Sequence, residues 1–156
     1  MLGENAMLPR RYSHLNDQQK CAVGENLARI AFILAGFEVY KSEYDDRGID
    51  FVARRPGSRF YSVQVKATGA TVNPCIYASK FHLTDEFLFV AVRLVDGELP
   101  AIYLARGFAW KSPSGCLGHN PDGGAAGGYY EFRFNQKDAA HLASFLFDSY
   151  VKALDS

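Results

Sequence analysis

The stretch Gly48–Lys66, GIDFVARRPGSRFYSVQVK, decides the fold of this chain. Two apolar runs flank residues 54–58, whose Arg-Arg-Pro-Gly-Ser sequence is typical of a turn. The first run contains an acid, Asp50, and the second contains Gln64 and Lys66. Two neighbouring strands joined in this way would bring a carboxylate, an amide and an ammonium group together.

Alternation along the second run predicts which side chains share a face. Val63 and Val65 point one way, whereas Gln64 and Lys66 point the other way. A hard cation such as Mg²⁺ prefers oxygen ligands, which Asp50, the Gln64 amide and the backbone carbonyl of Val65 would supply. Lys66 would then orient the attacking water or stabilise negative charge that develops on phosphorus. The stretch therefore predicts a seat for a divalent metal and a phosphodiester.

The composition limits the class of protein. The 156 residues suit one domain, and 17 basic residues balance 17 acidic residues, so any contact with nucleic acid must come from local patches. Cys21, Cys75 and Cys116 are far apart and lack the spacing of a zinc site, which favours a reduced compartment. The apolar run Leu27–Gly36 is too short to span a membrane and too far from the start for a signal peptide, so we expect a cytoplasmic protein.

Hydrophobic periodicity predicts an α/β domain with a mixed sheet over residues 16–156, preceded by an N-terminal arm over residues 1–15. Residues 68–80 and 112–128 are predicted to be irregular because they are rich in Gly, Pro and polar residues. The predicted helices are Gln18–Ala35 and, capped by Asn135, Gln136–Leu154; the predicted strands are Phe37–Tyr40, Ile49–Ala53, Phe60–Ala67, the hairpin Phe87–Val95 and Leu99–Ala105, and Tyr129–Phe134.

Asp50 followed by Gln64-Val65-Lys66 resembles the core motif of the PD-(D/E)xK nuclease superfamily in its Q-x-K form. That form is typical of Mrr-like restriction endonucleases and is related to archaeal Holliday-junction resolvases. The superfamily has a helix carrying a glutamate before the strands, and Gly24-Glu25 within GENLARIAFILAGFEV matches that element. The resemblance covers roughly residues 18–105 and implies a restriction-endonuclease-like core, a mixed β-sheet flanked by α-helices.

The resemblance also implies roles for individual residues. Asp50 would be the main ligand of Mg²⁺ or Mn²⁺, Gln64 would take the place of the usual second acid, and Lys66 would be the catalytic lysine. Glu25 would be an auxiliary ligand or a water-positioning acid, and the protein would act as a homodimer. Two departures stand out: the motif's proline is absent before Asp50, and the amide at position 64 removes one negative charge, so metal binding should be weaker.

Each of these residues also has an ordinary structural explanation. Glu25 pairs with Arg29 at helical spacing in the simplest case, and Asp50 bonds to a neighbouring turn or pairs with Lys66. Gln64 would then be an outward polar residue of an amphipathic strand. Four arginines flank the predicted site and either contact phosphates or lie on a solvated turn: Arg47, Arg54, Arg55 and Arg59.

The leading functional hypothesis is a metal-dependent DNA endonuclease that hydrolyses phosphodiester bonds. The alternative is a catalytically inactive module of the same fold that binds nucleic acid or a protein partner. A third hypothesis is a small-molecule enzyme of unrelated α/β fold, in which Asp50 and Lys66 would not lie close together.

Overall fold

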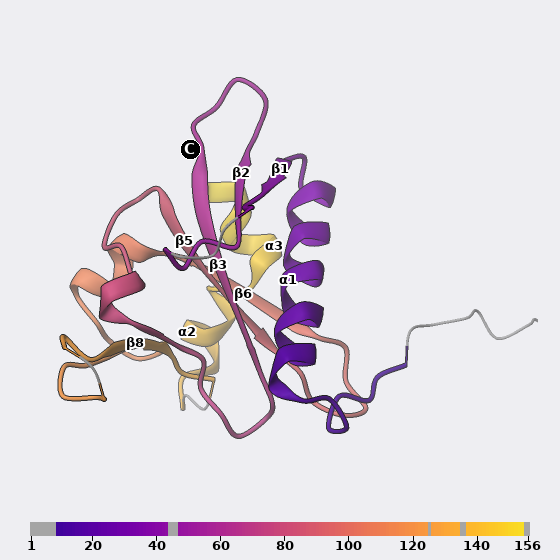
Figure 1. Ribbon diagram of the computed structural model, residues 1–156, viewed down its shortest axis with the longest axis vertical. Coiled ribbons are helices and arrows are strands. Elements are labelled where there is room, and N and C mark those ends of the chain that lie inside the picture. Colours follow the sequence, from indigo (N-terminus) through magenta and orange to yellow (C-terminus); the bar gives the residue numbers. More distant parts are fainter. Residues whose placement is uncertain (1–8, 44–46, 125, 135–136, 155–156) are drawn as a thin grey trace, which may run out of the picture.

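The computed structural model describes residues 9–43, 47–124, 126–134 and 137–154 (Figure 1). Its first element is the long helix α1, Asp17–Leu34, which begins at a reciprocal cap. The Asn16 side chain accepts a hydrogen bond from the Gln19 amide at 2.8 Å, and the Gln19 side chain accepts one from the Asn16 amide at 2.9 Å. Gly36, with φ of 91°, then turns the chain away. The predicted first helix is confirmed.

The main sheet is mixed and has five strands in the order β1-β2-β3-β5-β6. Only β3 and β5 are parallel, and the other three pairings are antiparallel. The hairpin of β5 and β6 was predicted from the Asp96-Gly97 turn and is confirmed. The strands are β1 Glu38–Lys41, β2 Phe51–Arg54, β3 Tyr61–Thr68, β5 Phe87–Arg93 and β6 Ala101–Arg106.

Both faces of the sheet are covered, so β5 is buried on both sides. On one face, Val63 and Val65 of β3 pack with Ala28 and Phe32 of α1. The opposite face of β5, which includes Phe89, packs in a second cluster against aromatic residues from a smaller sheet. The mixed sheet flanked by helices matches the predicted fold class, and Figure 1 shows α1 and β8 on opposite sides of the large sheet.

The smaller sheet corrects two predictions. Residues 68–80 were expected to be irregular, yet they contain β4, Cys75–Tyr77, and the short helix η1, Ala78–Lys80. Residues 112–128 were expected to be a loop, yet they contain β7, Leu117–Asn120. Both strands pair with β8, Tyr129–Phe132, in the order β4-β8-β7. The pairing joins short segments far apart in sequence, which local periodicity does not reveal.

The prediction of a single last helix is wrong. Three short segments replace it: α2 Ala139–Ala143, α3 Phe147–Tyr150 and η3 Val151–Ala153. The predicted cap, Asn135, lies outside the described residues, and Asp138 caps α2 instead. The break comes at Leu146, whose backbone is extended, because this segment joins the edge strand β6: the Leu104 amide donates to the Phe145 carbonyl at 2.8 Å.

The last described residues of the predicted N-terminal arm lie against the β5–β6 hairpin. The Asp96 carboxylate accepts hydrogen bonds from the Ser13 hydroxyl, the Tyr12 amide and the Ser13 amide. These bonds lower the pKa of Asp96 to about 2, and the bond from the Ser13 hydroxyl makes the largest contribution. The Tyr12 ring is buried in the core that α1 covers. Within the described residues, no helix has the length and apolar character to cross a bilayer.

Close packing of α1 on β3 makes Gly24 sensitive to substitution. A Cβ atom on Gly24 would lie 2.5 Å from the Cβ of Ala67. Gly24→Ala should therefore lower the free energy of unfolding by about 1–3 kcal/mol through overpacking, despite a gain of about 1 kcal/mol in helix propensity. Denaturant titration of the wild type and the variant measures this difference.

The matched control is the double variant Gly24→Ala with Ala67→Gly. It removes the Cβ atom of Ala67 with which the new Cβ atom at position 24 would clash. We expect the two changes together to cost less than the sum of their separate effects. A stabilising effect of Gly24→Ala alone would contradict the close approach of helix and strand.

Candidate active site

Among the residues that the structure describes, no strand pairs with the edge of β3 that faces β2 beyond Val63, and we call this the open edge of β3. Strand β2 pairs only with residues 61–63 of β3, whereas β5 pairs with residues 62–68. The Ser62 amide donates to Glu86 on the β5 side, and the Val63 carbonyl accepts from the Asp50 amide on the β2 side. Because these directions alternate along a strand, the amide and carbonyl of Val65 face the open edge. This edge therefore offers main-chain groups to a ligand.

Asp50 lies at this edge, immediately before β2. Its Oδ2 accepts a hydrogen bond from the Val65 amide at 2.7 Å, and its own amide donates to the Val63 carbonyl at 2.9 Å. The hydrogen bond between the Asp50 side chain and the Val65 amide forms just beyond the last main-chain pair of β2 and β3. It fixes the carboxylate beside the carbonyl of Val65, which belongs to the same open edge. The predicted proximity of Asp50 to the middle of β3 is confirmed.

Gln64 is the single buried polar side chain among the described residues, with 4% of its surface exposed. Its Oε1 atom is buried and has no hydrogen-bond partner in the part of the chain that the structure describes. An unpartnered buried acceptor costs about 1–3 kcal/mol, so such atoms normally meet a water, a cation or a ligand. The alternative that Gln64 is an outward polar residue is wrong.

Gly48 explains how the Gln64 amide is covered. A Cβ atom on Gly48 would lie 2.8 Å from Gln64 Oε1 and 2.9 Å from the Cβ of Lys80, so glycine allows the close approach of both residues. Its φ of 72° is a second reason for glycine at this position. The sequence analysis gave neither Gly48 nor Lys80 a role. The glycine two residues before Asp50 was a visible signal, whereas nothing local pointed to Lys80.

Lys66 is half-buried and follows Gln64 on the same face of β3. It adjoins the smaller sheet, as the Cys75 thiol indicates: burial raises the pKa of Cys75, the Lys66 ammonium lowers it, and the Glu131 carboxylate raises it. Cys75 and Glu131 are paired residues of β4 and β8. Glu131 also pairs with Arg133 at 2.7 Å. The smaller sheet thus places the polar groups of Cys75 and Glu131 on the side of β3 where Lys66 lies, which the sequence did not predict.

Glu25 lies on the other side of β3. It follows Gly24, which packs on Ala67 and Val65, and these residues alternate with Gln64 and Lys66 along the strand. Among the described residues, Glu25 forms no hydrogen bond or ion pair with Asp50, Gln64 or Lys66. Nor do the described residues form any cluster of three or more His, Cys, Asp or Glu side chains that could hold a metal. Glu25 could reach the site only around the open edge of β3.

Arg54 and Arg55 lie at the far end of the β2–β3 hairpin from Asp50 and have protein partners. Arg54 pairs with Glu38 at 2.9 Å and covers the ring of Phe60. Arg55 covers the ring of Phe37, 4.5 Å from its centroid, and donates a hydrogen bond to the carbonyl of Val151 at 3.2 Å. These contacts account for both side chains without a nucleic-acid ligand.

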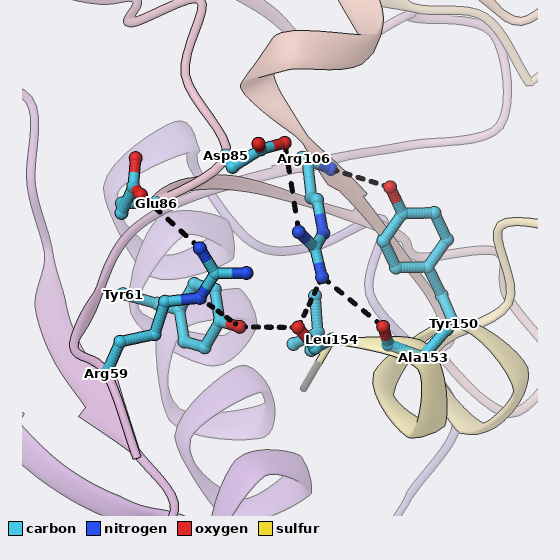
Figure 2. Close-up of polar contacts among 8 residues, drawn as sticks. All are labelled: Arg59, Tyr61, Asp85, Glu86, Arg106, Tyr150, Ala153 and Leu154. Atoms are coloured by element: carbon cyan, nitrogen blue, oxygen red, sulfur yellow. Dashed lines mark hydrogen bonds and ion pairs between the residues drawn. The ribbon is translucent and has the colours of Figure 1, made fainter. Parts of the chain in front are cut away.

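Arg59 belongs to a network that fastens the end of the described chain (Figure 2). It donates to the Tyr61 hydroxyl at 3.1 Å and pairs with Glu86 at 3.4 Å. Tyr61 in turn donates to the Leu154 carbonyl at 2.6 Å, which also accepts from Arg106. Of the four predicted phosphate-binding arginines, Arg47 alone lies next to Gly48 in sequence, and it is exposed.

Comparison with known proteins shows the fold. No family model and no curated protein sequence matches the chain. Among solved structures, the bacterial homing endonuclease I-Ssp6803I superimposes with a TM-score of 0.55 at 16% identity, covering 88% of this chain and 92% of that one. The Holliday junction resolvase Hjc of Archaeoglobus fulgidus gives a TM-score of 0.51 at 11% identity, covering 81% and 98%. The chain therefore has a restriction-endonuclease-like nuclease fold, as the sequence predicted.

The packing at Gly48 can be tested against a matched glycine. Gly48 and Gly57 both have positive φ, but a Cβ atom on Gly57 would meet nothing within 4 Å. In each alanine variant, backbone strain should lower the free energy of unfolding by about 1–2 kcal/mol. In Gly48→Ala, overpacking should lower it by about 1–3 kcal/mol more. Denaturant unfolding of both variants measures the difference; equal losses would contradict the contact among Gly48, Gln64 and Lys80.

Proposed function

We propose that this protein is a metal-dependent endonuclease that hydrolyses phosphodiester bonds in DNA. The observation that carries the proposal is the buried, unpartnered Oε1 of Gln64, which lies beside the open edge of β3 where Asp50 is fixed. A buried acceptor without a donor destabilises the fold, and binding of a cation or ligand explains why it is kept. The nuclease fold supports the same conclusion.

The oxygen atoms at this edge suit Mg²⁺ or Mn²⁺. Asp50 would supply the carboxylate, Gln64 its amide Oε1, and Val65 its main-chain carbonyl, with water completing the shell. Glu25 would act through a water from the helical side of β3. The single carboxylate in direct reach, where two are usual, would make the binding of the ion weak. Held by these residues, an ion would supply Lewis-acid chemistry, which polarises a phosphodiester and acidifies a coordinated water.

Lys66 would act on the reacting phosphate. Its position two residues after Gln64 on one face of β3 puts its ammonium on the same side of the sheet as the amide. A fixed positive charge there stabilises the negative charge that develops on the phosphoryl oxygens, and it orients the attacking water. The carboxylate of Asp50 would present its oxygens to the metal ion in one orientation, because the Val65 amide restrains it.

Two of the structural relatives are named for DNA reactions: one is a homing endonuclease and the other resolves Holliday junctions. DNA is therefore our proposed partner, and a homodimer is the proposed assembly. The balanced net charge of the chain means that local cations must make the contact. Arg47 is the predicted phosphate contact closest to Asp50 along the chain.

A second candidate function is a binding module that has lost catalysis. The amide at position 64 favours it, because the site has one acid fewer than the motif it resembles. Such a module would bind the same nucleic acid without cutting it. Gln64→Glu separates the two functions, since it restores the missing carboxylate.

The test is cleavage of plasmid, linear and branched DNA with Mg²⁺ or Mn²⁺ by the wild type and by Lys66→Ala. We expect metal-dependent cutting by the wild type and a rate at least about 100-fold lower in the variant, because a charge that stabilises the transition state is lost. Lys152→Ala, on the helical side of the sheet, is the matched control and should cut at the wild-type rate.

Two results would overturn the proposal. Full activity of Lys66→Ala would remove Lys66 from the mechanism. If neither the wild type nor Gln64→Glu cuts any substrate, while Gln64→Glu gains affinity for the metal, the binding module is the better account.

A further inference from the structure

Lys80 lies over the candidate site although it is distant in sequence from Asp50 and Lys66. The Cβ and Cδ of Lys80 would lie 2.9 Å and 3.3 Å from a Cβ atom on Gly48, and Gln64 Oε1 would lie 2.8 Å from the same point. The stem of Lys80 and the Gln64 amide therefore lie on the same side of Gly48, where a side chain on that residue would project. From this position, the long flexible side chain of Lys80 can bring its ammonium to a ligand bound beside Gln64.

The main chain around Lys80 is well anchored. The next residue, Phe81, is buried and contacts the rings of Phe87, Trp110 and Tyr130, with centroid distances of 5.1, 5.2 and 4.5 Å. At the start of η1, the Ala78 amide donates to the Gly128 carbonyl at 2.9 Å. The aromatic cluster and this hydrogen bond fix the point from which the Lys80 side chain leaves.

The ammonium of Lys80 has no ion-pair partner among the described residues. The side chain is exposed. A carboxylate at position 64 would have attracted this cation, but the amide found there does not neutralise it. Lys80 and Lys66 thus place two positive charges around the Gln64 amide.

A hollow lies near the candidate site, between Ser62 of β3 and the segment that follows Lys80. It has a volume of about 180 Å³ and is lined by Ile49, Ser62, His82, Thr84, Glu86 and Phe87. Ile49 lies between Gly48 and Asp50, and Ser62 precedes Gln64 by two residues on β3. His82 follows Lys80 by two residues, so the hollow begins close to Lys80 along the chain. Its hydroxyl and imidazole groups suit a sugar-phosphate chain, and the Glu86 carboxylate in the same lining is paired with Arg59 at 3.4 Å.

We propose that Lys80 binds a backbone phosphate of the nucleic acid strand next to the bond that is cut. The strand passes over Gly48, with one phosphate at Lys80 and the adjoining nucleotide at the hollow near His82. This inference rests on the proposed function, because it takes the ligand to be a polynucleotide. It adds a binding residue that the nuclease motif does not contain.

The test measures the salt dependence of DNA binding by fluorescence anisotropy, with Ca²⁺ in place of Mg²⁺ to prevent cutting. Each neutralised phosphate of duplex DNA contributes about 0.9 to the slope of log affinity against log salt concentration. We expect Lys80→Ala to lower the magnitude of that slope by about 1 and to weaken binding on all sequences alike. Lys80→Arg should keep the wild-type slope, because the charge is retained.

Lys152→Ala is the control, since it removes the same charge from an exposed residue on the helical side of the sheet. An unchanged slope for Lys80→Ala, or an equal fall for Lys152→Ala, would overturn the role of Lys80. If the wild type binds no DNA, the proposed function itself fails, which separates the two failures. Circular dichroism of each variant confirms that the fold is retained, as expected for an exposed side chain.

Discussion

The hydrogen bond from the Val65 amide to Asp50 Oδ2 is the interaction on which the rest of the candidate site depends. It forms where β2 stops pairing with β3, and at 2.7 Å it replaces the main-chain bond that the sheet would otherwise make. Among the described residues, β2 pairs with β3 only as far as Val63, so no residue of β2 lies opposite the Val65 carbonyl. The hydrogen bond thus fixes the carboxylate at the point where the pairing of the two strands ends.

The buried amide of Gln64 is kept at some cost in stability. An apolar residue of similar size on this face of β3 would join the second aromatic cluster without a desolvated oxygen. The chain instead keeps a buried amide whose Oε1 has no partner among the described residues. This amide is covered by Gly48, where the positive φ and the close approach of Gln64 require glycine. Both choices weaken the fold and are understandable if the amide contacts a cation or a substrate.

The sequence predicted those features that depend on local patterns. The apolar spacing of α1 predicted the first helix, and the Asp96-Gly97 turn predicted the hairpin of β5 and β6. Alternation predicted Gln64 and Lys66 on one face, and an antiparallel hairpin brings Asp50 to the amide of Val65, which lies between them along β3. The fold class followed from these elements and from the resemblance of the motif.

What the sequence did not reveal depends on long-range contacts. Strands β4 and β7 are short, and each exists through its pairing with β8. The last helix is broken because Leu146 joins the edge of β6, a contact that no periodicity signals. The position of Lys80 follows from the burial of Phe81 in the aromatic cluster, and that of Arg59 from the network around Leu154.

The central claim is that Asp50, the Oε1 of Gln64 and the carbonyl of Val65 together hold a divalent cation. The most direct measurement is a crystal structure of the protein with Mn²⁺, with the metal located by its anomalous scattering. The account predicts one peak at the open edge of β3, within about 2.0–2.3 Å of these three oxygens. A structure in which the edge stays empty at saturating Mn²⁺, or in which a protein donor satisfies Gln64 Oε1, would contradict it.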